Sequence, residues 1–186
     1  FADQTRRLEA LVQQDPRTVR WNIRLVEALA LEASLLAITG RRADSLIRRK
    51  RARELIEPLV AQDPANKAWL GTSLNLRLKE AMLLLAEGEL VAAAHLLDEA
   101  RTGYEKLAGG SANERSIAGL LALAWRLEAE RREALAKPDA GEAAARAVAM
   151  GESLIGDARA YEGDLGDYAY ACVVAGRITQ QRGDAQ

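Results

Sequence analysis

The strongest constraint on the fold is a segment that the sequence contains twice. LVQQDPRTVRW at 11–21 and LVAQDPANKAW at 59–69 lie 48 residues apart and share Leu, Val, Gln, Asp, Pro and Trp at matching places. The residue before a proline is pushed out of the α region, so each Asp-Pro pair ends one helix before the next begins. A chain that contains the same helix-to-helix join twice is organised in repeats of about that length.

Helical periodicity connects these joins. One apolar residue recurs every four positions after the first join: Trp21, Leu25, Leu29 and Ala33. This spacing places one buried stripe on a helix. Gly40 is expected to stop its helix, as glycine does at a C′ position, and Gly88 to turn the chain. Thr18 and Asn66 are expected to cap the helices that follow.

The predicted helices, after a short first one that ends near Val12, cover 18–39, 43–62, 66–86, 89–108, 114–136, 140–161 and 166–181. Ser111 and Glu114 have the spacing of a capping box at the start of the helix at 114–136. The helices pair into hairpins at 18–62, 66–108 and 114–161, followed by a final helix at 166–181.

Small residues support this register. Ala33, Ala81 and Ala129 are separated by 48 residues, as are Ala52 and Ala100, with Val148 next in line. Small side chains let two helices approach closely, and stacked hairpins bury apolar faces that one hairpin cannot bury alone. We therefore predict an all-α, right-handed solenoid of antiparallel hairpins with about seven to eight helices. It would form one domain over 1–186, as a piece of a longer protein.

The small residues also follow a family pattern. Two hairpins carry them at separations of 12 and then 7 positions: Ala33, Ser45, Ala52, and Ala81, Ala93, Ala100. This resembles the tetratricopeptide repeat (TPR), whose eighth, twentieth and twenty-seventh positions are small. The Asp-Pro-x-Asn-x-x-Trp join at 63–69 resembles that of a long-repeat subgroup in bacterial signalling proteins. In that subgroup the array often follows a serine/threonine kinase, cyclase or DNA-binding domain. The third hairpin lacks the Asp-Pro and the Trp of the join.

The resemblance implies protein or peptide recognition in a groove formed by the first helix of each hairpin. The family's groove positions correspond to Glu27, Ala30, Ser34, Asn75, Leu78, Met82, Leu123, Arg126 and Glu130. This surface would be apolar around Leu78 and Met82 and charged around Arg126 and Glu130. Ala30 and Ser34 do not match the Lys and Asn of the chaperone-tail carboxylate clamp, so the resemblance does not extend to that ligand.

A basic tract, residues 41–53, is the one unusual charge feature. Its candidate contacts for an anionic partner are Arg48, Arg49, Lys50, Arg51 and Arg53. The alternative is a solvated helix face, with i,i+4 pairs from Lys50 to Glu54 and from Arg53 to Glu57. No aromatic residue interleaves the tract, so a platform for stacking bases is missing. Nucleic-acid binding therefore rests on this tract alone.

Composition and single residues exclude several other functions. The net charge is −1, with 49% apolar and 28% charged residues and one cysteine, as expected of a soluble protein without a disulfide or a membrane span. We expect the cytoplasm rather than a periplasmic ectodomain. A lone histidine, His95, supplies no metal site, and Cys172 in an apolar stretch is expected to be a buried, inert thiol. We expect no catalytic residue, metal or cofactor.

Tryptophan at the two joins is expected to pack the corner rather than contact a ligand. Trp21 and Trp69 hold equivalent positions, whereas Trp125 has no equivalent and its role stays open. Three functions remain: a scaffold or adaptor, a regulatory or sensory region of a membrane-bound serine/threonine kinase or transcription regulator, and a nucleic-acid-binding repeat. The sequence does not identify the partner or the oligomeric state.

Overall fold

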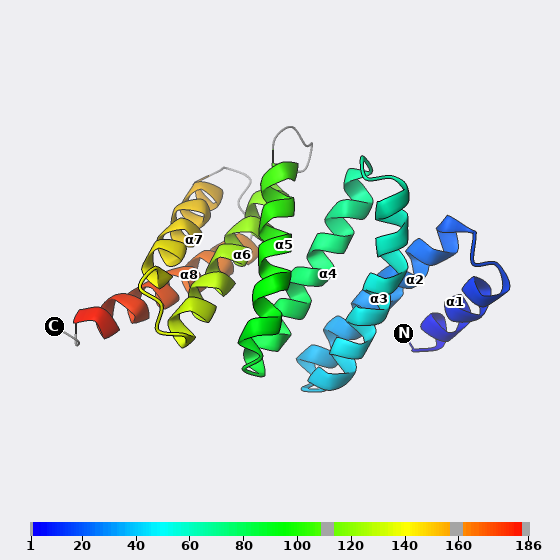
Figure 1. Ribbon diagram of the computed structural model, residues 1–186, viewed down its shortest axis with the longest axis horizontal. Coiled ribbons are helices and arrows are strands. Elements are labelled where there is room, and N and C mark those ends of the chain that lie inside the picture. The colour runs from blue at the N-terminus through cyan, green and yellow to red at the C-terminus, as the bar shows by residue number, and fades with distance from the viewer. Residues whose placement is uncertain (1, 109–113, 157–161, 184–186) are drawn as a thin grey trace. The chain divides into compact units, whose positions relative to one another are not determined.

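The computed structural model describes residues 2–108, 114–156 and 162–183, and over these residues it is all-α with eight helices and no strand (Figure 1). The helices are α1 (Ala2–Gln14), α2 (Val19–Ile38), α3 (Arg42–Gln62), α4 (Lys67–Ala86), α5 (Leu90–Leu107), α6 (Glu114–Ala134), α7 (Ala140–Ile155) and α8 (Glu162–Gly183). The predicted helices correspond to these one by one. The largest difference is at α7, which ends at Ile155, before the predicted end at residue 161.

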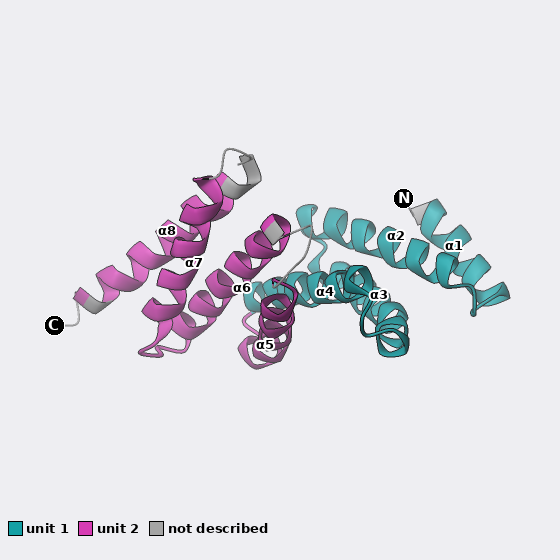
Figure 2. Cartoon of the chain, turned by 90° about the horizontal axis from the view of Figure 1, so that it is seen from above, with its two compact units in different colours: residues 1–87 teal, residues 88–186 magenta. Residues whose placement is uncertain are grey.

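The chain divides into two compact units (Figure 2). In unit 1, residues 1–87, α2 packs on α1 and α3, and α3 packs on α4. In unit 2, residues 88–186, α6 packs on α5 and α7, and α8 packs on α7 and also reaches α6. Successive helices therefore pack consecutively within each unit, which confirms the predicted all-α, solenoid-like array. The prediction of a single domain over 1–186 stays a prediction.

The turns after α2, α4 and α6 share one backbone feature. Gly40 and Gly88 have φ of 79° and 80°, and Ala136 has φ of 51°. These residues are 48 positions apart. Both α2 and α6 end in the same hydrogen-bonded motif, with the Arg41 N–H donating to Leu36 O at 2.8 Å and the Lys137 N–H donating to Arg132 O at 2.9 Å. The third hairpin thus keeps the left-handed turn although alanine replaces glycine there.

One predicted cap is present and one is not. The Asn66 side chain accepts a hydrogen bond from the Trp69 N–H at 3.2 Å, which confirms the cap of α4. Thr18 is the N-cap residue of α2 as predicted, but the prediction that its hydroxyl caps the helix is wrong, because that hydroxyl makes no cap hydrogen bond to the backbone. The hydroxyl donates to Asp15 Oδ2 at 2.5 Å. The capping box that includes Ser111 lies outside the described residues.

The small repeat positions are buried in both units. Ala33, Ala81 and Ala129 are fully buried, and so are Ala52 and Ala100. In the third hairpin the buried residue of this kind is Ala147, whereas the predicted Val148 is half-buried. The register of α7 is therefore one residue shorter than the repeat predicts.

Both corner tryptophans belong to the core of unit 1. Trp21 and Trp69 pack, half-buried, against one apolar cluster that includes Leu25, Leu29 and Ile56. This contact fits the predicted corner-packing role.

Candidate functional site

The predicted groove residues of α2 lie in different environments. Glu27 is exposed and pairs with Arg24 at 3.0 Å. Ser34 is half-buried, and its hydroxyl donates to Ala30 O at 2.9 Å and accepts from Arg49 Nη2 at 3.3 Å. Ser34 therefore ties α2 to α3, and Glu27 alone of these residues is open to solvent.

On α4 the two residues predicted to form the apolar centre of the groove, Leu78 and Met82, differ in how far they are buried. Leu78 is fully buried, so its side chain is a core group and not part of an open surface. Asn75 and Met82, three positions before and four after it, are half-buried. The family register therefore does not identify an open face of this helix.

On α6 the predicted charged residues are paired to each other. Arg126 Nη1 donates to Glu130 Oε1 at 2.5 Å, and the Arg126 guanidinium lies 4.5 Å from the ring centroid of Tyr170 on α8. Leu123 is buried. Arg126 and Glu130 thus neutralise each other, and Arg126 also joins α6 to α8.

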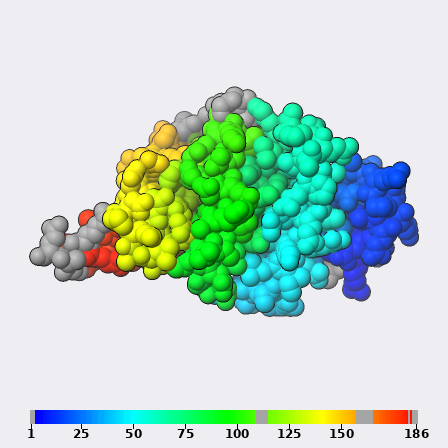
Figure 3. All heavy atoms as spheres, in the orientation of Figure 1, coloured from blue at the N-terminus to red at the C-terminus, as the bar shows by residue number. Residues whose placement is uncertain are grey.

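The basic tract lies on α3, whose atoms form part of the surface visible in Figure 3 (cyan). Arg49 is only 4% exposed, so it cannot contribute to an open anionic-partner patch. Burial lowers the pKa of its guanidinium, and the nearby Glu80 partly offsets this. Lys50 is exposed. The other three arginines pair with carboxylates: Arg48 with Glu32 at 3.1 Å, Arg51 with Glu54 at 3.3 Å, and Arg53 with Glu57 and Glu80, both at 3.2 Å.

The one histidine and the one cysteine of the sequence, His95 and Cys172, both lie in unit 2. His95 is exposed, with Nδ1 3.5 Å from Glu99 Oε2 on the same helix. Cys172 is half-buried on α8, which is less enclosed than predicted.

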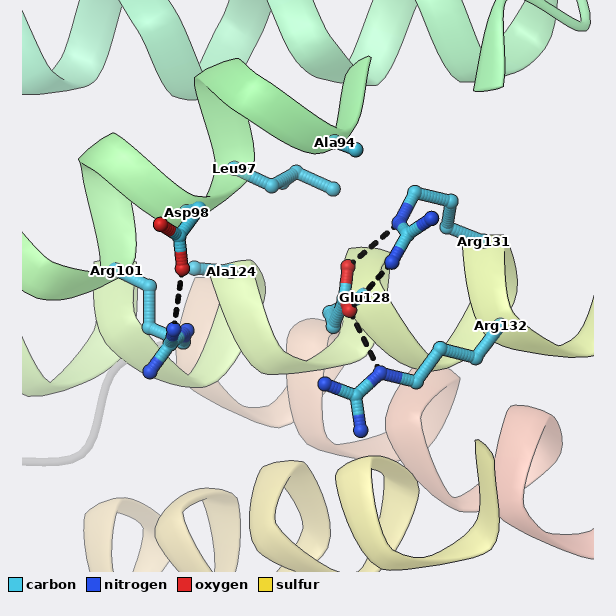
Figure 4. A pocket seen from close by; sticks show the side chains of 8 residues that line it. All are labelled: Ala94, Leu97, Asp98, Arg101, Ala124, Glu128, Arg131 and Arg132. Carbon is cyan, nitrogen blue, oxygen red and sulfur yellow. Dashed lines mark hydrogen bonds and ion pairs between the residues drawn. The ribbon is translucent and has the colours of Figure 1, made fainter. Parts of the chain in front are cut away.

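A pocket of about 220 Å³ opens between α5 and α6 (Figure 4). Its lining combines an apolar wall with charged side chains: Ala94, Leu97, Asp98, Arg101, Ala124, Glu128, Arg131 and Arg132. Figure 4 shows the Glu128 carboxylate between the guanidinium groups of Arg131 and Arg132, with Leu97 on the facing helix.

Glu128 is the buried polar centre of this pocket, with 8% of its surface exposed. Arg131 holds it bidentately, Nε to Oε2 and Nη2 to Oε1, both at 2.8 Å, and Arg132 Nε donates to Oε1 at 2.6 Å. Burial acts to raise the pKa of Glu128, but the two arginines outweigh it, so the pKa is lowered. The carboxylate is therefore ionised at neutral pH and already accepts three charge-assisted hydrogen bonds.

The contact between the second helix of one hairpin and the first helix of the next, here called a joint, occurs at equivalent positions in both units. Glu80 in the α3–α4 joint and Glu128 in the α5–α6 joint are 48 residues apart, and their side chains are 12% and 11% exposed. Arg53 and Arg101 are equivalent in the same way. Arg53 bonds across its joint to Glu80 at 3.2 Å, whereas Glu128 is bonded by its own helix.

Two substitutions between these joints account for the pocket. Leu76 and Arg49 in the α3–α4 joint are both buried, at 3% and 4% exposure. Their equivalents in the α5–α6 joint are Ala124 and Leu97. A leucine is thus replaced by an alanine and an arginine by a shorter leucine, so two side chains that fill the first joint leave room in the second.

The arginines beside this pocket differ in position and partners from those of the α3–α4 joint. Arg131 and Arg132 replace Leu83 and Leu84 of α4. Arg101 donates to Asp98 Oδ1 at 2.5 Å and to Glu105 at 3.2 Å, and its guanidinium lies 4.9 Å from the ring centroid of Trp125.

Trp125 has a defined place at this joint. The ring also meets Arg146 of α7, with the guanidinium 4.6 Å from the centroid. Two cations therefore contact one buried tryptophan, an arrangement that the electron-rich ring favours. Trp125 replaces Arg77, which in the α3–α4 joint pairs with Glu57 at 3.0 Å.

Family-pattern reasoning missed the pocket, because it considered only the first helix of each hairpin. A position-by-position comparison at 48 residues would have found it, since Glu80 and Glu128 match while Leu76 and Ala124 do not.

No protein family model matches the sequence, and none of the curated proteins matches it. Among solved structures, the crystal structure of BtubC (BKLC) from P. vanneervenii is similar, with a TM-score of 0.51 and 14% sequence identity over 99% of this chain and 89% of that chain. At this identity the likeness concerns the helical fold alone. In the part of the chain that the structure describes, none of the helices has the length and apolar character needed to cross a bilayer.

Proposed function

We propose that this chain is a TPR-like helical repeat that binds a peptide segment of a protein partner and carries out no reaction itself. The left-handed turn at Gly40, Gly88 and Ala136 and the buried alanines at 33, 81 and 129 support the repeat. They fix backbone positions, and stacked helical repeats of this kind present extended surfaces for partners.

The observation that carries the proposal is the departure from the repeat at the α5–α6 joint. If a joint serves packing alone, filling its space stabilises the fold. Leu76 and Arg49 fill the α3–α4 joint in this way. The α5–α6 joint keeps the carboxylate of the repeat but leaves a pocket of about 220 Å³ beside it. A partly open pocket with an apolar wall and a few fixed polar groups is the usual form of a binding site.

The setting we propose is a scaffold or regulatory region of a larger bacterial signalling protein. The Asp-Pro…Trp join supports it through the resemblance to the long-repeat subgroup. The sensory region of a membrane-bound serine/threonine kinase or transcription regulator is the alternative within this setting.

Nucleic-acid binding is the weaker candidate. It rests on the basic tract, in which Arg49 is buried and Arg48, Arg51 and Arg53 already face carboxylates. Phosphate contacts would have to displace these ion pairs, and net binding to nucleic acid depends on unneutralised cations.

A selection from a phage-displayed library of random dodecapeptides tests the proposal. We expect enrichment of related sequences, and binding of the synthetic peptides by fluorescence anisotropy. A single-stranded oligonucleotide run in parallel should show weak, salt-sensitive binding only. Absence of enriched peptides together with tight oligonucleotide binding would reverse the preference.

A further inference from the structure

We propose that the α5–α6 pocket anchors an acidic side chain of the bound peptide, with its carboxylate on Arg131 and Arg132 and its aliphatic stem against Leu97 and Ala124. This inference rests on the proposed function, because it identifies the chemistry of one anchor in the peptide. It assigns the pocket a carboxylate ligand rather than a cation, a metal or a purely apolar group.

The space is of the right kind. The pocket of about 220 Å³ far exceeds the ~30 Å³ that one water molecule occupies in the liquid. Ala94, Leu97 and Ala124 form an apolar wall, and the arginines and Glu128 form the polar side. A short side chain with methylene groups and a charged end can contact both sides.

The unused hydrogen-bonding capacity of the pocket is on the donor side. Arg131 uses Nε and Nη2 for Glu128, and Arg132 uses Nε for Glu128 and Nη1 for Asp139 at 2.9 Å. A guanidinium has five N–H groups, so among the residues that the structure describes, Nη1 of Arg131 and Nη2 of Arg132 keep both of theirs. Both side chains are partly buried, at 18% and 23% exposure, where an anionic acceptor gains more than it would in bulk water.

A cationic ligand fits less well. Glu128 already accepts three hydrogen bonds, and Asp98 is 70% exposed and bonded to Arg101. A ligand cation would also approach three guanidinium groups at close range, which is repulsive. An arginine pair that stays fixed by buried Glu128 is instead preorganised for a carboxylate, because the fork of N–H groups matches its two oxygens.

The test uses the tripeptide acetyl-Ala-Glu-Ala-amide as probe and acetyl-Ala-Gln-Ala-amide as its neutral match. The readout is the indole N–H signal of each tryptophan in an ¹⁵N-labelled protein. Trp125 lies against Arg101 of the pocket, whereas Trp21 and Trp69 lie in the core of unit 1 and serve as internal controls. We expect the Glu peptide to shift Trp125 saturably, and the Gln peptide to bind at least about tenfold more weakly. Equal shifts with both peptides would overturn the carboxylate assignment.

Two variants restore the residues of the α3–α4 joint. Ala124→Leu introduces the residue that Leu76 places there, and should abolish the Trp125 titration by filling the pocket. Arg132→Leu introduces the equivalent of Leu84 and should weaken the Glu peptide about tenfold, since Arg131 still holds Glu128. Lys106→Gln, exposed on α5 and outside the pocket lining, is the matched control and should bind as the unaltered protein does. Binding that survives in folded Ala124→Leu would refute the anchor. If Ala124→Leu does not fold, binding of the Glu peptide to Arg132→Leu as tight as to the unaltered protein would refute it.

The library selection separates this inference from the proposed function. Peptides that bind the unaltered protein and Ala124→Leu equally would support peptide recognition and overturn the acidic anchor. If the Glu tripeptide binds saturably but the library yields no enriched peptide, the anchor would be supported. The support for recognition of longer segments would then be removed. Enriched peptides that share an acidic residue and fail on Ala124→Leu would support both.

Discussion

The α3–α4 joint and the α5–α6 joint begin from the same repeat positions and reach different structures. Each has a mostly enclosed carboxylate on its second helix, Glu80 or Glu128, and an arginine on its first, Arg53 or Arg101. In the first joint the arginine crosses to the carboxylate and large side chains fill the space. In the second, the carboxylate is held by Arg131 and Arg132, and a pocket remains.

This difference separates what the repeat determines from what it leaves open. Turns and buried alanines recur in both units because they fix the backbone, where one methyl group decides how closely helices pack. The polar side chains between the helices are not fixed in this way. They can exchange partners with little effect on the backbone, so a site can develop at one joint while the array stays intact.

The largest test reverses the packing difference. Leu76→Ala should create in unit 1 the space that Ala124 leaves in unit 2, and we expect a loss of about 2–5 kcal/mol in the free energy of unfolding. Ala124→Leu, its mirror in unit 2, fills an existing pocket and should raise stability by about 0.5–2 kcal/mol. Urea unfolding followed by tryptophan fluorescence and circular dichroism measures both. A loss below about 1 kcal/mol for Leu76→Ala would show that the α3–α4 joint is not packed around this leucine.

A second test removes the carboxylate that crosses the first joint. Glu80→Gln leaves Arg53 and the buried Arg49 without their shared negative charge, so we expect a loss of about 1–3 kcal/mol. Glu54→Gln is the matched control on α3, because Glu54 pairs with Arg51 where both side chains are about half exposed, at 50% and 49%. Such a surface pair contributes less than about 1 kcal/mol. Equal losses in the two variants would mean that Glu80 has no special structural role.

The sequence predicted the helices and turns well, because these depend on local chemistry and on a repeat visible in the chain. Gly40 ends its helix with a positive φ, and the Asn66 side chain caps the next helix, as these residue types usually do. Thr18 holds the N-cap position of α2, but its hydroxyl donates to Asp15 and makes no cap hydrogen bond to the backbone. Leu78 was expected on an open groove and is buried, because a family register taken from a shorter repeat does not fix the rotation of a longer helix.

The pocket could not be predicted in the same way. Glu128 has two possible sets of partners in the sequence, Arg101 across the joint by analogy with Arg53, or Arg131 and Arg132 at i+3 and i+4. The first set follows from the repeat, and the second from the spacing of neighbours on one helix. The set of partners that forms depends on Trp125. This residue occupies the place of Arg77, and its ring contacts the Arg101 guanidinium. That competition involves three helices and has no local sequence signature.

A third test uses pH to measure what the charge of Glu128 contributes to stability. The folded pKa of Glu128 is lowered from its ordinary value of 4.5, so the ionised group contributes stability above that value and the contribution is lost as pH falls through the folded pKa. At pH 7 Glu128→Gln should lose about 1–2 kcal/mol. The difference from the unaltered protein should shrink as the pH falls below about 4.5 in urea titrations. A difference that stays constant down to pH 3 would show that the charge of Glu128 is not what stabilises the joint.

The smallest test concerns the turn that all three hairpins share. Ala136 adopts φ of 51°, where its equivalents are Gly40 and Gly88. A left-handed alanine costs about 1–2 kcal/mol, while glycine adds about 0.5–1 kcal/mol of entropy to the unfolded chain. Ala136→Gly should therefore raise the free energy of unfolding by about 0.5–1 kcal/mol.

Gly40→Ala is the converse of this change and should lower the free energy of unfolding by a similar amount. A Cβ at Gly40 would meet no atom within 4 Å, so its effect reports the backbone alone. Thermal and urea unfolding of the two variants would show opposite signs if the left-handed turn is a property of the repeat. The same sign in both would mean that the turn at Ala136 is held by contacts particular to unit 2, and that the two hairpins share less than their spacing of 48 residues indicates.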